Sequence, residues 1–375
     1  MEKRFSIEQK SLLSVLAAMQ PICTKRTTLE TTSCIYFHVG HRELVLKSTD
    51  LEISLQASCA INDSTITNAE TFLVPGRRIF DIVRELDGII DIVIKDNQIA
   101  LNAGPVKLTL HIKDAQEFPP FPERIENLMH IDASMLNKML ESVAFLIPQN
   151  NANPALNGML LEVDTQSMMM TATDGHCLVQ TRSKQSGLEE AKTWLLPKRA
   201  VFELKKVLES CTDKAIFIGI CGNQLVFSGE LFNFFTKLLA DPFPQYRQIL
   251  DKTSFQAATV ERSRFAKTLR RSASLLSGHF LATRFGFAPH AIRVTMQNKD
   301  VGTMDEELPV EGLQGDAIDI RFYAPYLLNG LQSINESTVT FYLKNSAKPI
   351  IFESSEEGIE LTYLVMPVSS TSHAA

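Results

Sequence analysis

The chain repeats one order of features about every 122 residues. A helix-like segment that a proline opens begins at Pro75 and again at Pro197, and a proline-flanked phenylalanine occurs at Phe121 and again at Phe243; both pairs lie 122 positions apart. A fixed period of this kind marks a repeated structural unit, and 375 residues hold about three such periods. The sequence therefore predicts three similar domains, with bounds 1–126, 127–254 and 255–375.

Each predicted unit contains two rounds of one helix followed by about four short strands. Apolar residues at helical spacing predict the helices, and alternating β-branched segments such as CIYFHV and MMMTAT predict the strands. The expected opening helices cover 7–19, 132–147 and 261–276, and the expected second helices begin at Pro75, at Pro197 and near Tyr323. Proline suits a first helical turn because its missing N–H would have had no partner there. The fold class is thus α+β, with two helices packed on antiparallel sheet in each unit.

Sheets repeated in this way have edge strands that must be paired or covered. Joining the edges of neighbouring units would satisfy them. An arc built from such joints could continue head to tail into a second chain and close as a ring, which avoids an open filament.

The charge of the chain is unevenly distributed. The whole chain carries −6, yet the six expected helical segments together carry +8, so the remainder carries −14. On a helical projection Lys267, Arg270 and Arg271 lie opposite the apolar residues, as do Arg199 and Lys206 on their own helix. A charged solvent face is common on any single helix. Segregation over the whole set predicts a surface that contacts a phosphate backbone without reading base sequence, and the scarcity of aromatic residues among these cations favours duplex over single-stranded DNA.

Other sequence signals limit the chemistry. The six cysteines show no C-x-x-C spacing, which favours reduced, mostly buried thiols. No G-x-x-x-x-G-K-[ST] segment occurs, so we expect any ATP chemistry to belong to a partner. The N-terminus MEKRFSIEQK lacks the apolar core of a signal peptide, and no apolar run reaches the length of a membrane span, so the sequence predicts a cytoplasmic protein.

Taken together, these features resemble the bacterial β sliding clamp family, the processivity subunits of DNA polymerase III. The resemblance runs nearly from end to end and rests on FSIEQKSLL, STDLEI, VPGRRIFDIVREL, LNGMLLE, ATDGH, FPQYRQIL and YLVMP. It implies a homodimeric ring of six domains, with helices lining a hole that encircles duplex DNA. It also implies a non-catalytic, cofactor-free protein that binds the replicative polymerase, the clamp loader, and other polymerases and repair proteins through short linear peptides.

The family's motifs carry site residues onto this chain. The implied peptide pocket comprises Leu156, Thr173, Gly175, His176, Leu178, Pro244, Ile249, Tyr326, Leu364, Met366 and Pro367. The residues expected to face DNA, from the resemblance and the charge pattern, are Arg26, Arg77, Gln149, Asn150, Arg199, Lys206, Lys267, Arg270 and Arg271. The implied dimer interface includes Leu108, Leu110, Leu275 and Leu276.

The sequence departs from the family's pattern in three places. Cys177 and Gln248 stand where well-known members carry arginine, and VSSTSHAA replaces a short ending after Met366-Pro367. The two replacements alter the charge expected around the pocket and bear on its selectivity for acidic peptide residues.

Two other functions compete with a DNA clamp. Asp174 and His176 could support hydrolysis, but no G-x-S-x-G or H-E-x-x-H segment accompanies them, and the first copy has Asp50-Leu51-Glu52 where the second has Asp174-Gly175-His176. Asp174 is better explained as a residue that satisfies turn backbone groups. The third possibility is a repeat scaffold that does not bind DNA.

Overall fold

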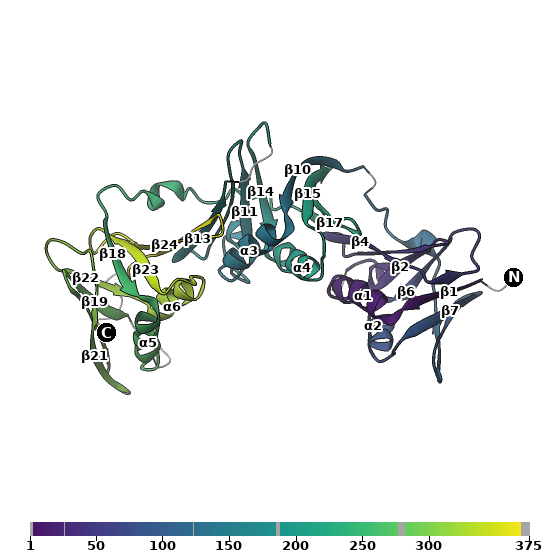
Figure 1. Ribbon diagram of the computed structural model, residues 1–375, viewed down its shortest axis with the longest axis horizontal. Helices are drawn as coiled ribbons and strands as arrows, with labels where there is room; N and C mark the ends of the chain where they lie inside the picture. The colour runs from purple at the N-terminus through teal and green to yellow at the C-terminus, as the bar shows by residue number, and fades with distance from the viewer. Residues whose placement is uncertain (1–2, 26, 123, 185–187, 277–281, 369–375) are drawn as a thin grey trace. The chain divides into compact units, whose positions relative to one another are not determined.

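The structure is a computed structural model that describes residues 3–25, 27–122, 124–184, 188–276 and 282–368. It contains the six expected helices (Figure 1). They are α1 (Gln9–Cys23), α2 (Gly76–Arg84), α3 (Ala133–Ala144), α4 (Lys198–Glu209), α5 (Arg262–Ala273) and α6 (Ala324–Gln332). None of the described helices is long and apolar enough to cross a bilayer.

The chain forms two compact units. The first comprises Met1–Asn137 and Arg199–Leu238, and the second comprises Lys138–Lys198 and Leu239–Ala375. The middle repeat therefore contributes strands to both units. The division into three domains at 126 and 254 stays a prediction from the repeat. In the structure, the middle repeat pairs its strands with the first repeat in one unit and with the third repeat in the other.

The first unit contains two antiparallel sheets. A five-stranded sheet has the order β5 (Asp63–Ser64), β1 (Lys3–Glu8), β7 (Ile89–Lys95), β8 (Gln98–Ala103) and β9 (Val106–His111). An eight-stranded sheet has the order β10 (Glu126–Asp132), β15 (Ala215–Cys221), β16 (Gln224–Ser228), β17 (Phe232–Lys237), β4 (Ile53–Ala60), β3 (Glu43–Thr49), β2 (Cys34–Val39) and β6 (Glu70–Pro75).

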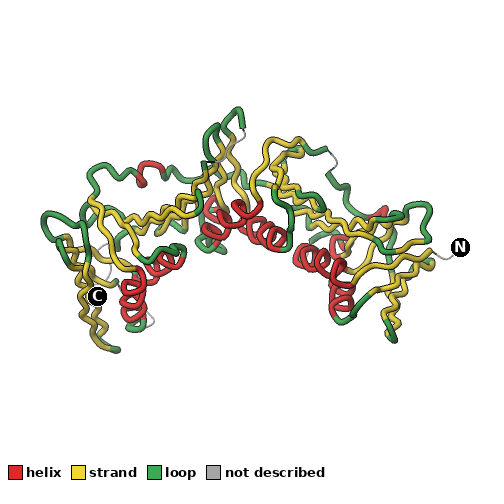
Figure 2. Tube along the Cα trace, in the orientation of Figure 1, coloured by secondary structure: helices red, strands yellow, loops and turns green. Residues whose placement is uncertain are grey.

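The second unit also contains two antiparallel sheets. Its eight-stranded sheet has the order β14 (Lys192–Pro197), β11 (Gly158–Val163), β12 (Met168–Thr173), β13 (Cys177–Ser183), β25 (Ile359–Val365), β24 (Ile350–Glu356), β23 (Thr338–Leu343) and β18 (Gln256–Glu261). Its four-stranded sheet has the order β21 (Gly302–Pro309), β20 (Ala291–Asn298), β19 (Thr283–Ala288) and β22 (Ile318–Phe322). Within each unit the helices lie on one side of the eight-stranded sheet (Figure 2).

Neighbouring repeats are joined edge to edge, as the sequence predicts. In the first unit β17 of the middle repeat pairs with β4 of the first repeat, with Phe235 opposite Ser54. In the second unit β13 of the middle repeat pairs with β25 of the third, with Leu178 opposite Leu364. Backbone hydrogen bonds across these two joints satisfy strand edges that would otherwise be exposed.

The structure corrects two details of the predicted elements. A strand precedes each opening helix, since β1, β10 and β18 come before α1, α3 and α5. Pro75 and Pro197 end strands, and helices α2 and α4 begin one residue later. The reason is visible at Pro75, whose ψ of 112° is extended and keeps the residue outside the helix as its N-cap. Pro325 does lie in the first turn of α6, as expected.

The helices bury the predicted apolar faces. Leu12, Leu16 and Met19 of α1 are buried, and so are Phe265 and Leu269 of α5. Cysteine burial is also close to expectation, with Cys23, Cys34, Cys59 and Cys177 buried and Cys211 and Cys221 half-buried; all six thiols are free.

An ion pair links α4 to the turn before β4, at the first joint, which is the pairing of β17 with β4. The second joint is the pairing of β13 with β25. The Asp50 side chain is 0% exposed and receives the Arg199 guanidinium, with Lys25 Nζ 3.7 Å from its Oδ2 atom. Arg199 Nη2 also donates to the Pro21 carbonyl oxygen at 3.1 Å. A buried carboxylate requires such partners because its desolvation is otherwise unfavourable.

We therefore expect Arg199→Met to lower the free energy of unfolding by about 2–3 kcal/mol, because the buried Asp50 carboxylate would keep only Lys25 as a cationic partner. Urea unfolding followed by circular dichroism measures this change. The control is Arg77→Met, which removes a side chain that is 78% exposed and should change stability by less than about 0.5 kcal/mol. Equal midpoints for the two variants would contradict the role assigned to Arg199.

Candidate functional site

The ATDGH segment forms a tight turn between β12 and β13. Asp174 Oδ1 accepts hydrogen bonds from the backbone N–H groups of His176 at 2.8 Å and Cys177 at 2.7 Å. Thr173 Oγ1 donates to the Cys177 carbonyl oxygen at 2.6 Å. Gly175 has a φ of +94°, a conformation that favours glycine. The interpretation of Asp174 as a residue that satisfies turn backbone groups is confirmed.

The first repeat builds the same turn between β3 and β4. Asp50 Oδ1 accepts from the N–H groups of Glu52 at 2.9 Å and Ile53 at 2.8 Å. Thr49 Oγ1 donates to the Ile53 carbonyl oxygen at 3.1 Å. Leu51 takes the place of Gly175 and has a φ of +75° despite its side chain. The duplication is therefore preserved at the level of individual hydrogen bonds.

Each turn is held to the strand that crosses the joint. The N–H of Met366 donates to the His176 carbonyl oxygen at 2.9 Å, and the N–H of Lys237 donates to the Glu52 carbonyl oxygen at the same distance. The strand register matches the residues of the two joints. Leu178 of the second joint corresponds to Ser54 of the first, Leu364 to Phe235, and Met366 to Lys237.

Only the second joint is apolar at these positions. Leu178 and Leu364 face each other across the joint and belong to a buried cluster. The other buried members are Ala155, Leu160, Leu195, Tyr246 and Ile351, with Leu239, Phe243, Leu250, Phe255, Tyr342 and Met366 packed against them half-buried. A hydroxyl and an ammonium replace two of these apolar groups at the first joint. The second joint alone can offer an apolar surface to a ligand.

The structure brings the predicted pocket residues together in the second unit. Leu156, Thr173, Leu178 and Leu364 are buried, while Met366 and Pro367 are half-buried. Gly175, His176, Pro244 and Ile249 are exposed around them, and Ile249 is 40% exposed. A separate cavity of about 700 Å³, with Lys138, Phe145 and Gln332 among its lining residues, shares no residue with this set.

Tyr326 of α6 also joins the set. Its ring stacks on His176 with the centroids 5.7 Å apart, and its backbone carbonyl accepts a hydrogen bond from the Tyr363 hydroxyl at 2.9 Å. The third repeat thus contributes one aromatic side chain beside the turn of the middle repeat.

Neutral side chains occupy the two positions at which the resemblance implies arginine. Burial raises the pKa of the Cys177 thiol to about 12, so this side chain is uncharged at neutral pH. Gln248 is exposed and uncharged. Arg247 carries a charge, but its guanidinium donates to Glu162 Oε1 at 2.8 Å.

The two side chains considered for hydrolysis have other partners in the structure. Asp174 is engaged with the turn backbone and His176 stacks on Tyr326. Across the part of the chain that the structure describes, no group of three or more His, Cys, Asp or Glu side chains is placed to hold a metal ion.

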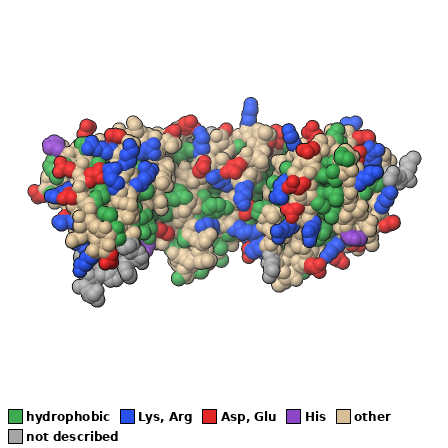
Figure 3. Space-filling view, turned by 90° about the horizontal axis from the view of Figure 1, so that it is seen from below, with side chains coloured by type: hydrophobic (Ala, Val, Ile, Leu, Met, Phe, Trp, Pro, Cys, Tyr) green, Lys and Arg blue, Asp and Glu red, His purple; other side chains and the backbone are tan. Residues whose placement is uncertain are grey.

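The cationic side chains on the helices are only partly free. Figure 3 looks onto the side of each unit where its helices lie and shows Lys and Arg among acidic side chains. Arg77, Gln149, Asn150, Lys267 and Arg270 are exposed. Lys206 pairs with Glu203 on its own helix, and Arg271 forms a two-point pair with Glu306 of β21. The Arg199 guanidinium is bound to the buried Asp50 carboxylate. Arg26 lies outside the described residues.

The predicted dimer residues fall in two places, a sheet edge and the end of a helix. Leu108 and Leu110 belong to β9, the edge strand of the five-stranded sheet, and Leu108 is exposed. Leu275 and Leu276 are half-buried just after α5, where the Leu275 carbonyl accepts from Asn298 Nδ2 at 2.6 Å.

Sequence reasoning missed two residues that shape the site. The Tyr246 hydroxyl donates to Glu162, and Gln180 Nε2 donates to the Tyr246 hydroxyl at 2.9 Å. Tyr246 stands in the FPQY segment that marks the repeat, which could have drawn attention to it. Glu162 is one carboxylate in a strand, and nothing in its sequence context separates it from a solvent-facing residue.

Comparisons with known proteins agree with the repeat and the fold. Three family models match successive segments: the N-terminal domain of the DNA polymerase III beta subunit at residues 3–122, its central domain at 130–245 and its C-terminal domain at 247–369. The beta sliding clamp of Pseudomonas aeruginosa is 28% identical over 371 residues, covering 97% of this chain and 99% of the relative. That of Pseudomonas putida is 27% identical over the same shares.

Solved structures lead to the same group of proteins. A DNA polymerase sliding clamp from Pseudomonas aeruginosa with a ligand superposes with a TM-score of 0.89 at 25% identity and covers 98% of this chain and 100% of that one. A sliding clamp from the same species bound to griselimycin gives the same values. The fold is that of the sliding clamps of DNA polymerases. This chain belongs to the family of bacterial DNA polymerase III beta subunits, the beta sliding clamps.

The two equivalent turns provide a matched test of backbone strain. We expect Gly175→Ala to destabilise the protein by about 1 kcal/mol, because a side chain at positive φ is strained even though a Cβ there meets nothing within 4 Å. Leu51→Gly, at the equivalent position, should cost nothing or stabilise slightly. Thermal unfolding measures both changes, and Gly175→Ala should lower Tm by a few degrees. A Gly175→Ala midpoint equal to that of the unmodified chain would refute the strain.

Proposed function

We propose that this chain encircles duplex DNA as a sliding clamp and tethers the replicative polymerase, and other replication and repair proteins, through the apolar surface of the second joint. The observation that carries this proposal is the pair of strand joints, which pair neighbouring repeats edge to edge and leave one joint apolar. The activity needs no bond-making residue, so we propose a non-catalytic role.

The proposed contact with DNA is loose. Exposed Arg77, Lys267 and Arg270 can neutralise phosphates irrespective of base sequence, and Gln149 and Asn150 add neutral polar contacts. Arg77, Lys206 and Arg271 also share their charge with carboxylates of the same unit. Contacts of this kind would hold DNA weakly enough to slide, so that retention would come from enclosure.

The proposed ring closes through a second copy of the chain. Edge strand β9 carries Lys107 and His111 and no acidic residue, whereas edge strand β21 carries Asp305, Glu306 and Glu307 and no basic residue. Pairing of β9 in one chain with β21 in the next would continue the edge-to-edge joints between chains. Such a head-to-tail contact closes into a ring when made twice.

The proposed peptide surface depends on apolar anchoring. Leu178, Leu364 and Met366 present aliphatic groups, and Gly175 allows a ligand backbone to approach closely. Because Cys177 and Gln248 are neutral, we expect peptide affinity here to depend less on acidic side chains than in relatives that carry arginine there. We also propose griselimycin, which binds related clamps, as a ligand of this surface.

Retention on DNA distinguishes enclosure from ordinary binding. With its clamp loader and ATP, the chain should remain on nicked circular DNA after gel filtration and should leave within minutes once a restriction enzyme linearises the circle. Blocking both DNA ends with bound protein should restore retention. Retention that is the same on open linear DNA and on circles would refute the topological mechanism.

Substitution of Met366 tests the peptide surface. A carboxylate in the half-buried position of Met366→Asp would be poorly solvated against Leu178 and Leu364, so we expect at least a tenfold loss of affinity for the polymerase catalytic subunit and for griselimycin. Surface plasmon resonance measures both affinities, and sedimentation should give the unmodified dimer mass. Unchanged affinity would show that the surface lies elsewhere.

A further inference from the structure

The linker between the middle and third repeats, residues 240–255, lies beside the apolar surface without backbone support. It contains one short 3-10 helix, Arg247–Leu250. All of its residues are described, and no backbone-to-backbone hydrogen bond joins them to the rest of the unit; the nearest is from the Leu239 N–H to the Leu195 carbonyl oxygen, at 2.9 Å. Its position must therefore be set by side chains.

One side-chain attachment of the linker is to Glu162 of β11, and another joins Lys252 to Glu353 of β24 at 2.5 Å. The Tyr246 hydroxyl donates to one carboxylate oxygen of Glu162, and Arg247 Nη2 donates to the other at 2.8 Å. The Glu162 side chain is 13% exposed and Tyr246 is 5% exposed. Hydrogen bonds to a largely buried carboxylate are among the stronger ones in proteins.

Two more strands reach the same hydroxyl. Gln180 Nε2 donates to it at 2.9 Å and Thr171 Oγ1 lies 3.3 Å away. Burial, followed by the hydrogen bond to Glu162, raises the pKa of Tyr246 to about 12, so the phenol keeps its proton at neutral pH. Strands β11, β12 and β13 thus hold one side chain of the linker.

This attachment reaches directly to the rim of the peptide surface. The Ile249 N–H donates to the Tyr246 carbonyl oxygen at 3.0 Å, and Pro244 lies two residues before Tyr246. The Phe243 ring packs edge-on against the Tyr246 ring with centroids 6.0 Å apart. Any displacement of Tyr246 would move the residues expected to contact a peptide.

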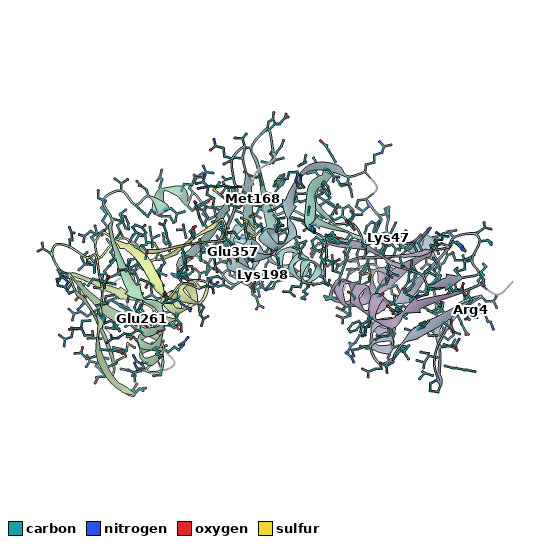
Figure 4. All side chains as sticks on the ribbon, in the orientation of Figure 1. Arg4, Lys47, Met168, Lys198, Glu261 and Glu357 are labelled. Atoms are coloured by element: carbon teal, nitrogen blue, oxygen red, sulfur yellow. The ribbon has the colours of Figure 1, made fainter. Side chains whose placement is uncertain are left out.

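The first joint provides a comparison within the same chain. By register, His38 replaces Glu162 and Lys47 replaces Thr171, and by the 122-residue period Arg124 replaces Tyr246. The Lys47 ammonium, whose residue is labelled in Figure 4, instead lies 5.2 Å from the Phe121 ring centroid and 5.5 Å from that of Tyr36. The carboxylate attachment belongs to the joint with the apolar surface.

We propose that Tyr246 and Glu162 are positioning residues, which fix the linker 240–255 so that Pro244 and Ile249 form a preorganised wall of the peptide surface. This inference rests on the proposed function, because it assigns the attachment a role in partner binding. Preorganisation would act by removing the cost of ordering the linker when a ligand binds. Neither residue is expected to touch the ligand.

Two conservative variants test the attachment. Tyr246→Phe removes one hydroxyl and keeps the ring in the cluster, and Glu162→Gln removes the charge at constant size. We expect each to weaken binding of griselimycin and of the polymerase catalytic subunit about three- to tenfold, mainly through faster dissociation. The double variant should lose less than the product of the single losses, because both changes remove the same contact. Lys47→Met, the control, alters the first joint and should leave both affinities within twofold.

Hydrogen exchange separates positioning from a general loss of stability. Amide exchange in Tyr246→Phe should rise in residues 242–251 and remain unchanged in β13 and β25. Single variants within twofold of the unmodified affinity, while Met366→Asp abolishes binding, would overturn the positioning role and leave the proposed function intact. Exchange that rises throughout the second unit would also overturn it. If the unmodified chain bound neither probe, the proposed peptide surface itself would fail.

Discussion

The structure depends on backbone pairing between strands of different repeats. A single repeat of this kind leaves sheet edges whose N–H and C=O groups need partners. The pairings of β17 with β4 and of β13 with β25 supply those partners and extend each eight-stranded sheet across two repeats. The same pairing places a turn of one repeat beside a strand of another, so a site can form from residues that are distant in sequence.

Duplication gave the chain two such joints, and side-chain chemistry distinguishes them. Both turns use an aspartate that accepts two backbone N–H groups and a threonine that closes the loop. At the first joint the aspartate also binds Arg199, so the joint is reinforced by charge. At the second joint aliphatic residues replace the polar ones and leave an apolar surface. Backbone geometry is common to both joints, whereas the cluster of aliphatic side chains is found at the second.

Much of the fold follows from local sequence, because period and pattern are local properties. The 122-residue repeat, the six helices and strands such as Cys34–Val39 are predicted closely. The strand that precedes each helix was not predicted, since Lys3–Glu8 and Gln256–Glu261 show little contrast with the helices they adjoin. The Glu162–Tyr246 contact was also inaccessible, because it joins residues 84 positions apart through one hydroxyl. Only the tertiary register reveals that pairing.

The cationic side chains of the helices fall into two groups, those bound to carboxylates and those exposed to solvent. The difference affects how a clamp could hold DNA and still move along it. A guanidinium bound to a buried carboxylate, as in Arg199 with Asp50, is fixed in position and contributes to stability. An exposed side chain such as Lys267 keeps its rotational freedom and can pass from one phosphate to the next. If every helical cation were fixed, the surface would present a rigid pattern that matched DNA at particular positions and so resisted translation. Because phosphate attraction depends on exposed charges and is screened by salt, the lasting association of the proposed clamp with DNA would have to come from enclosure.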